Sequence, residues 1–190
     1  MKIRSLAAVS ALVLAALSLT ACSSNGSGTS DTNTQVQEQL GEFSSSDIMF
    51  LQMMIPHHQQ AVDMGTLAES QGLSPTIKAL ATQIKSEQSP EITKMTAWVS
   101  AAGASVKMDH DMGMGGMLSD SEFAALKAAR GADFDKLFLK DMITHHSSAV
   151  AMAVMVMHSQ NTSIKSLSKA IIDSQSKEIQ YMQGLLKTLG

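Results

Sequence analysis

Two segments of this chain repeat each other, and the repeat limits the fold more than any other feature of the sequence. Residues 47–64 align without gaps on residues 135–152, and ten of the eighteen aligned positions are identical. The segments that follow match as well, because residues 77–95 and 164–182 share Ile-Lys, Gln-Ser and Glu-Ile pairs and then a methionine at the same spacing. A chain with this pattern is expected to contain two copies of one structural unit.

The periodicity of both copies is that of an α-helix. Apolar residues and one histidine recur at steps of three and four between Phe50 and Ala68, and again between Phe138 and Val156. A sustained alternation of apolar and polar residues, which would mark a strand, is missing from the sequence. Each unit is therefore predicted to be a helical hairpin, and two hairpins close naturally into an all-α, up-and-down bundle of four long helices.

Capping residues predict where the helices begin and end. Ser or Asn precedes four of the five predicted helices, and the Ser-Asp-Ser-Glu stretch at residues 119–122 has the pattern of a capping box. Pro56 and Pro90 fall inside predicted helices, where each should cause a kink. The predicted helices, with their caps and the glycines that stop them, are 44–72, 74–103, a short linking helix at 119–131, 133–158 and 161–189.

Residues 1–43 are expected to lie outside the folded domain. Lys2 and Arg4 precede a short apolar run, which indicates a secretory signal peptide over residues 1–21. The Leu-Thr-Ala-Cys sequence at its end resembles a bacterial lipobox, in which Cys22 would carry the lipid; the alternative is ordinary cleavage before an unmodified Cys22. Residues 22–43 are predicted to be a flexible tether and residues 44–190 the folded domain. The expected location is the cell envelope, on a membrane outside the cytoplasm.

Charge and cysteine content exclude several kinds of function. Without the signal peptide the chain has 12 basic and 17 acidic residues, a formal charge of −5, so no nucleic-acid partner is expected. Cys22 is the only cysteine, which rules out a disulfide within the chain and leaves no thiolate for metal binding. Methionine is abundant instead, with 15 in the chain.

Both repeats carry Met-x-x-His-His with a further methionine six residues later, and this pattern predicts a copper site. Imidazole suits copper, zinc, iron and nickel, but thioethers are soft ligands that favour Cu(I), and zinc rarely takes methionine. Adjacent histidines on a helix point about 100° apart, so which member of each pair faces inward stays open. The candidate ligands are Met54, His57, His58 and Met64 in the first repeat and Met142, His145, His146 and Met152 in the second.

A second set of candidate copper ligands lies in the glycine- and aspartate-rich segment between the halves, where packing in a core is a poor explanation for methionines. The alternative is that this segment is simply a flexible linker. The candidate ligands are Met108, His110, Met112, Met114 and Met117.

Other residues have plainer interpretations. Met49, Met155 and Met157 are expected to fill the core, as methionines on helices usually do. Glu87, Glu91 and Glu178 are expected to be surface carboxylates, with inward-pointing metal ligands as the alternative. No glutamate is followed three residues later by histidine, which argues against a ferritin-type di-iron oxidase.

The two His-His segments, residues 53–64 and 138–152, resemble the signature segments of the bacterial exported proteins grouped as domain of unknown function 305. The resemblance extends over residues 47–189. It implies a ferritin-like four-helix bundle and kinship with periplasmic or secreted copper-binding members, the CopM-type proteins.

We therefore expect an exported, lipid-anchored copper-binding protein that acts in copper tolerance, sequestration or transport. It is not expected to be an enzyme, since no nucleophile–base arrangement is visible. Two alternatives remain open: a metal-dependent oxidase of ferritin-like type, and a metal-free helical protein that interacts with the envelope or a partner. If histidines bind the copper, the unperturbed pKa of imidazole predicts that binding weakens below about pH 6.5.

Overall fold

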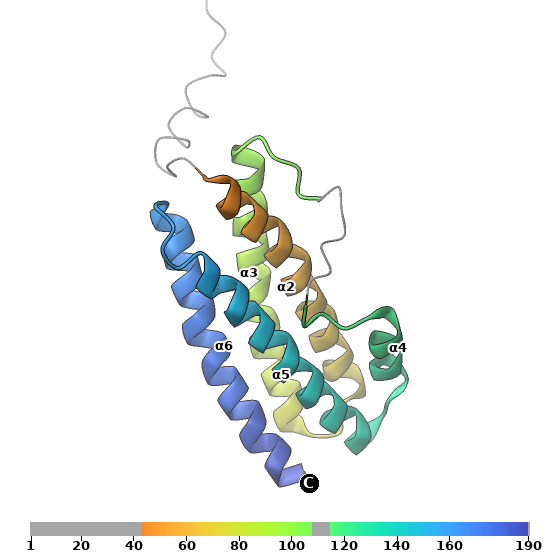
Figure 1. The fold of residues 1–190 in the computed structure, drawn as a ribbon. Coiled ribbons are helices and arrows are strands. Elements are labelled where there is room, and N and C mark those ends of the chain that lie inside the picture. Colours follow the sequence, from red (N-terminus) through yellow and green to blue (C-terminus); the bar gives the residue numbers. More distant parts are fainter. Residues whose placement is uncertain (1–42, 108–114, 190) are drawn as a thin grey trace, which may run out of the picture.

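The computed structural model describes residues 43–107 and 115–189, which form five α-helices and no strand (Figure 1). Helices α2 and α3 form one antiparallel hairpin, α5 and α6 form the other, and α2 packs against α5. The short helix α4 lies beside the bundle near α5. The prediction of a four-helix bundle built from a duplicated hairpin is confirmed. The helices are α2 (Ser45–Gln71), α3 (Pro75–Ala101), α4 (Asp120–Ala128), α5 (Gly131–Met155) and α6 (Thr162–Leu189).

Local capping explains most of the helix boundaries. Ser44 and Ser119 each accept a hydrogen bond from the backbone N–H of the third residue of the helix that follows, and the acidic side chain of that residue accepts one from the serine N–H. Three boundaries differ from the prediction by more than one residue, the end of α4 and both ends of α5. Helix α4 ends at Ala128, and Gly131 begins α5 with a φ of +60°, a conformation that glycine adopts without strain. Helix α5 ends at Met155, before a turn. Helices α2 and α3 continue through Pro56 and Pro90.

Apolar side chains gather in two clusters, one toward each end of the bundle. The first core cluster includes Leu80, Phe134 and Phe138, and the second includes Phe50, Val99 and Ile171. Equivalent residues of the two repeats fall in opposite clusters, as they must when antiparallel copies pack about a twofold axis. The methionines show this arrangement: Met64, Met142 and Met182 belong to the first cluster, and Met54, Met95 and Met152 to the second.

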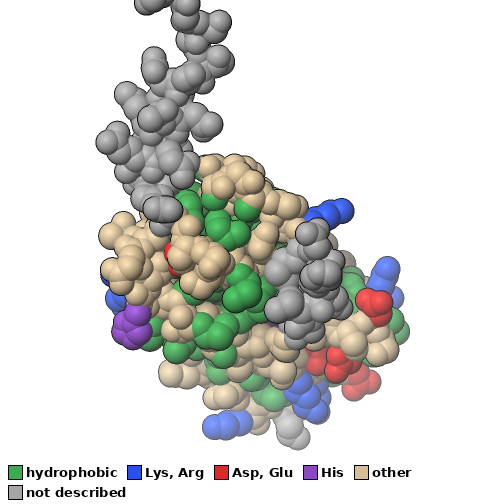
Figure 2. Space-filling view, turned by 45° about the horizontal axis from the view of Figure 1, so that its top comes forward, with side chains coloured by type: hydrophobic (Ala, Val, Ile, Leu, Met, Phe, Trp, Pro, Cys, Tyr) green, Lys and Arg blue, Asp and Glu red, His purple; other side chains and the backbone are tan. Residues whose placement is uncertain are grey.

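Three methionines expected in the core are on the surface. Met49 is 43% exposed, Met155 70% and Met157 40%, so that prediction is wrong. Met155 is the last residue of α5 and Met157 lies in the turn after it; Val156 between them is the residue that packs into the second core cluster, so the two methionines point to solvent. Apolar side chains are open to solvent at the end of the bundle where α2 begins, which Figure 2 views obliquely. No helix in the described part of the chain combines the length and apolarity needed to span a bilayer.

One repeated residue, the buried aspartate that opens each copy, has different roles in the two halves. Asp47 accepts hydrogen bonds from the backbone and hydroxyl of Ser44, at 2.9 and 2.7 Å, and so caps its own helix. Asp135 instead reaches the other hairpin, where its carboxylate accepts from the backbone N–H groups of Leu73 (3.0 Å) and Ser74 (2.8 Å). Asp135 therefore holds the α2–α3 turn against the start of α5.

Replacing Asp135 with alanine is expected to lower the free energy of unfolding by about 2–3 kcal/mol, because two backbone N–H groups in part-buried hydrogen bonds lose a charged acceptor. Urea denaturation followed by circular dichroism measures this change. The control is Asp133→Ala, which removes an exposed carboxylate from the first turn of α5 and should cost less than about 1 kcal/mol. Equal losses in the two variants would mean that Asp135 does not hold the turn.

Candidate metal centre

A layer of buried polar side chains crosses the bundle between the two core clusters. Each long helix contributes a pair of residues, and the pairs on α2 and α3 occupy the same repeat positions as those on α5 and α6. All four histidines have no exposed surface, so both members of each pair face inward. This polar layer consists of His57, His58, Gln88, Glu91, His145, His146, Gln175 and Glu178.

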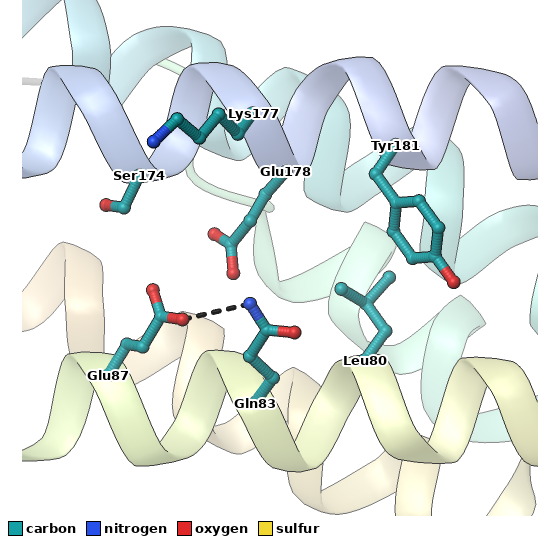
Figure 3. A pocket seen from close by; sticks show the side chains of 7 residues that line it. All are labelled: Leu80, Gln83, Glu87, Ser174, Lys177, Glu178 and Tyr181. Carbon is teal, nitrogen blue, oxygen red and sulfur yellow. Dashed lines mark hydrogen bonds between the residues drawn. The ribbon is translucent and has the colours of Figure 1, made fainter.

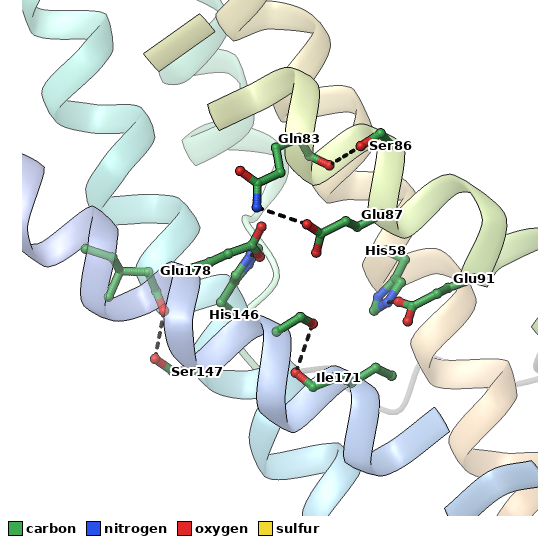
Figure 4. Close-up of polar contacts among 11 residues, drawn as sticks. His58, Gln83, Ser86, Glu87, Glu91, His146, Ser147, Ile171 and Glu178 are labelled. Carbon is green, nitrogen blue, oxygen red and sulfur yellow. Dashed lines mark hydrogen bonds and ion pairs between the residues drawn. The ribbon is translucent and has the colours of Figure 1, made fainter. Parts of the chain in front are cut away.

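Two histidines of the layer are held by carboxylates. The Nε2 atom of His58 lies 2.9 Å from Glu91 Oε2, and that of His146 lies 2.8 Å from Glu178 Oε2 (Figure 4). Because a carboxylate accepts, Nε2 donates, and in a neutral ring this leaves the Nδ1 lone pair free. Neither Nδ1 atom has a hydrogen-bond partner among the described residues. A histidine fixed in this way by a carboxylate is typical of metal ligands.

The expectation that Glu91 and Glu178 are surface carboxylates is therefore wrong. Both point inward because α3 and α6 turn these positions toward the histidine pairs on the partner helix of each hairpin. Glu178 is only 6% exposed, and the side chain of Glu91 is 20% exposed. Glu87 is half-buried like Glu91, but it accepts its hydrogen bond from Gln83, at 2.9 Å, and not from a histidine.

The other two histidines meet at the centre of the layer. The ring centroids of His57 and His145 are 3.7 Å apart, with 35° between the ring planes. His57 Nε2 contacts the hydroxyl of Ser148 at 2.8 Å. Neither ring nitrogen of His145 makes a well-formed hydrogen bond to any described residue. Native proteins rarely leave buried polar atoms unpaired, so these nitrogens indicate a ligand-binding role.

Burial keeps the two central imidazoles uncharged. Burial, together with the nearby His58 and His146, lowers the pKa of His57 from 6.5 to about 3. Burial, followed by the neighbouring histidines, also holds the pKa of His145 well below 6.5, and a backbone group of His57 opposes this only slightly. The two rings therefore keep their lone pairs in mild acid. The expected weakening of copper binding below about pH 6.5 does not apply to these ligands, because it assumed an unperturbed imidazole pKa.

Acid is expected to destabilise the metal-free fold as pH falls from 6.5 toward 3. In this range His57 and His145 bind protons in the unfolded chain but not in the folded chain. The free energy of unfolding therefore falls by about 1.4 kcal/mol per pH unit for each group. Asp141 opposes the loss below about pH 6, because burial and then Glu122 raise its pKa from 3.8 to about 6. Melting temperatures measured across this range test the trend. His57→Leu should flatten the slope, whereas the exposed His158→Leu should leave it unchanged.

The four methionines predicted to bind with the histidines are buried and lie one helical turn or two from them. Met54 and Met152 border the layer on the side of the second core cluster, and Met64 and Met142 on the side of the first. Each side of the layer is thus offered one thioether from each repeat. A buried methionine can fill the core, and its thioether can also bind a soft ion.

The remaining predicted ligands are mostly outside the described residues. These ligands are Met108, His110, Met112 and Met114. The predicted lipidation site, Cys22, also lies outside the described residues. Met117 is described: it is half-buried and lines a pocket of about 320 Å³ with Pro56, Gln59 and Phe123. The structure therefore places Met117 on the α2 side of the bundle, in this pocket and not among the residues of the polar layer.

The donor set of the layer fits a soft ion. In residues 43–107 and 115–189, no three His, Asp or Glu side chains are arranged to hold one metal ion as they stand. Buried imidazole nitrogens without partners are present, and thioethers flank them on both sides. Such a set suits copper or silver and lacks the clustered oxygens that calcium or magnesium needs.

Comparison with known proteins agrees with this fold and motif. The sequence model of the family described as Domain of unknown function (DUF305) matches residues 47–186. The chain is similar to a DUF305 fragment from Deinococcus radiodurans, at 27% identity and a TM-score of 0.73 over 78% of this chain and 99% of that one. It is also similar to CopM in the Cu(I)-bound form, at 31% identity and a TM-score of 0.64 over 77% of this chain and 98% of CopM.

The Cu(II)-bound form of CopM gives 32% identity and a TM-score of 0.64 over 79% of this chain and all of CopM (100%). No protein among the curated sequences matches the chain. The family model covers both hairpins and both His-His pairs, and the solved relatives have the same bundle. This chain belongs to the DUF305 family.

Proposed function

We propose that this protein binds copper in the cell envelope, chiefly as Cu(I), through the histidines of the polar layer and the methionines that flank it. The observation that carries the proposal is the set of fully buried imidazoles with unpartnered ring nitrogens. The relatedness to CopM, which has been solved with Cu(I), Cu(II) and silver, supports the same class of ion.

In this proposal each part of the layer has a separate task. His145 and the Nδ1 atoms of His58 and His146 provide nitrogen ligands, and flanking thioethers provide sulfur. Glu91 and Glu178 fix the rings of the two outer histidines and increase their basicity. The apolar clusters on either side keep water from the ion, which would limit its redox chemistry. Sequestration, tolerance or transport of copper are roles that need no turnover.

The proposal places the protein outside the cytoplasm, on a membrane. The proposed location is inferred from the signal-like residues 1–21 and from the lipobox-like sequence that ends at Cys22. The mature N-terminus would be lipidated Cys22, with residues 23–43 as the tether to α2. Mass spectrometry of the protein isolated from its native membrane tests this part: an unmodified N-terminus would contradict the anchor and leave copper binding unaffected.

A Cu(I) titration of the mature chain against a competing chelator tests the central claim. Tight binding that survives when the methionines at positions 108, 112, 114 and 117 are changed to leucine supports the layer as the main site. Binding lost in that variant would move the site to the segment between the halves. Oxygen consumption measured on the same copper-loaded sample should stay at the level of the buffer, since a faster rate would favour an oxidase.

A further inference from the structure

The helices of the bundle are not equally close to one another. Helix pairs α2–α3, α5–α6 and α2–α5 pack closely, whereas α3 and α6 approach each other much less. Two pockets open along the groove between α3 and α6, with volumes of about 390 and 310 Å³. We call this region the α3–α6 groove; Figure 3 shows the larger pocket with side chains from both helices around it.

Each pocket is lined by one of the two carboxylates that hold a buried histidine. Glu178 lines the larger pocket and Glu91 the smaller one. In both cases the Oε2 atom accepts a hydrogen bond from a histidine of the polar layer. Glu178 is only 6% exposed, and its Oε1 atom is buried without a hydrogen-bond partner among the described residues. Figure 3 shows this carboxyl group directed into the pocket, toward Glu87 and Gln83.

On the opposite side of the layer, the backbone of Gly116 lies against α5. Gly116 has a φ of +84° and packs so tightly on α5 that a Cβ there would lie 2.2 Å from the Cβ of Ser148. Ser148 is the residue whose hydroxyl contacts His57. The neighbouring Leu118 is fixed to Gln60 by two hydrogen bonds, of 2.7 and 2.9 Å. An ion that approached His57 from the α2–α5 side would have to displace this anchored chain.

We propose that copper reaches the buried histidines through the α3–α6 groove, and that Glu91 and Glu178 act as transfer ligands between the pockets and these histidines. A carboxylate oxygen facing the pocket takes the ion first. The Nδ1 atom of the imidazole that is hydrogen-bonded to the same carboxylate takes it next, while the Nε2 proton stays on the ring. Glu87 adds negative charge to the larger pocket, which the Lys177 ammonium at its wall partly offsets. This inference rests on the proposed copper-binding function and adds the direction from which the ion enters.

Filling the groove tests the inference without touching a histidine. The double variant Ser174→Trp/Ala170→Trp places an indole in each pocket, and Gln59→Trp is the matched control in the pocket on the α2 side. Stopped-flow transfer of Cu(I) from a chelator measures association, and transfer back measures dissociation. We expect both rates to fall by about tenfold or more in the groove variant, with the equilibrium affinity unchanged, because only the path is obstructed.

Rates equal to those of the parent in the groove variant, or slowed only in Gln59→Trp, would overturn the inference and leave the proposed function intact. A parent chain that binds no copper would overturn the proposed function itself. Circular dichroism checks the fold of each variant. Should Ser174→Trp unfold the bundle, Lys177→Trp fills the same pocket from an exposed position. Slower transfer in Lys177→Trp/Ala170→Trp would be informative because the lost positive charge by itself should speed cation binding.

Discussion

Replacing His145 with leucine is expected to stabilise the metal-free protein and at the same time to abolish its tight binding of copper. His145 is fully buried, and both of its ring nitrogens lack hydrogen-bond partners among the described residues. An unpartnered buried polar group costs about 1–3 kcal/mol, and a leucine of similar volume removes that cost. The gain in the free energy of unfolding should therefore be about 1–3 kcal/mol. A residue kept at such a cost to stability is more readily explained by ligand binding than by packing.

Copper affinity should change in the opposite direction. Loss of an outer-shell partner typically weakens metal binding by about 10- to 100-fold, and loss of a ligand should exceed that. Urea denaturation of the metal-free protein and a Cu(I) competition titration measure the two effects on one sample. His158→Leu, which changes an exposed histidine after α5, is the control and should alter neither quantity appreciably. Unchanged copper affinity in His145→Leu would remove this residue from the site.

Neutralising the two carboxylates behind the histidines should produce the second large effect. Glu91→Gln and Glu178→Gln keep the size of each side chain but remove the negative charge that orients and polarises His58 and His146. Each change should weaken equilibrium copper binding by about 10- to 100-fold, and Glu178→Gln should have the greater effect because its pair is more buried. The titration that tests His145→Leu also measures these variants.

Glu87→Gln supplies the matched control for both. Glu87 lies on α3 one turn before Glu91 and lines the same pocket as Glu178, yet its hydrogen bond goes to Gln83 and not to a histidine. Its equilibrium copper affinity should stay close to that of the parent chain. If all three variants lost affinity equally, the effect would come from the overall charge of the groove and the His–Glu pairs would have no special role.

Much of the fold was predictable because its signals are local. A capping serine or asparagine acts on the helix residues next to it, and so does a glycine at the end of a helix. The beginnings of α2, α3, α4 and α6 could therefore be located from the sequence. The internal repeat then indicated two equal hairpins. The misplaced boundary at Gly131 has the same origin, because a glycine with positive φ can end one helix or precede the next.

The composition of the site was only partly predictable. Sequence spacing identified the histidine pairs and the methionines beside them. It could not identify Glu91 and Glu178 as partners of these histidines, since the two members of each pair are 33 and 32 residues apart. The matching positions of the two glutamates in the repeats were a usable signal, as were those of Gln88 and Gln175. Position in the repeat did not show whether these residues face the core or the solvent.

The sequence alone determined the helices, their duplication and the kind of ion that histidine and methionine together favour, because each depends on neighbouring residues or on ligand chemistry. Tertiary structure decided everything that depends on how the helices face one another. It turned both members of each His-His pair inward, joined two of them to carboxylates, and gave Asp135 a role in the other hairpin. It also lowered the pKa of His57 and His145, because desolvation depends on every helix packed around a group and not on the residues next to it in the chain.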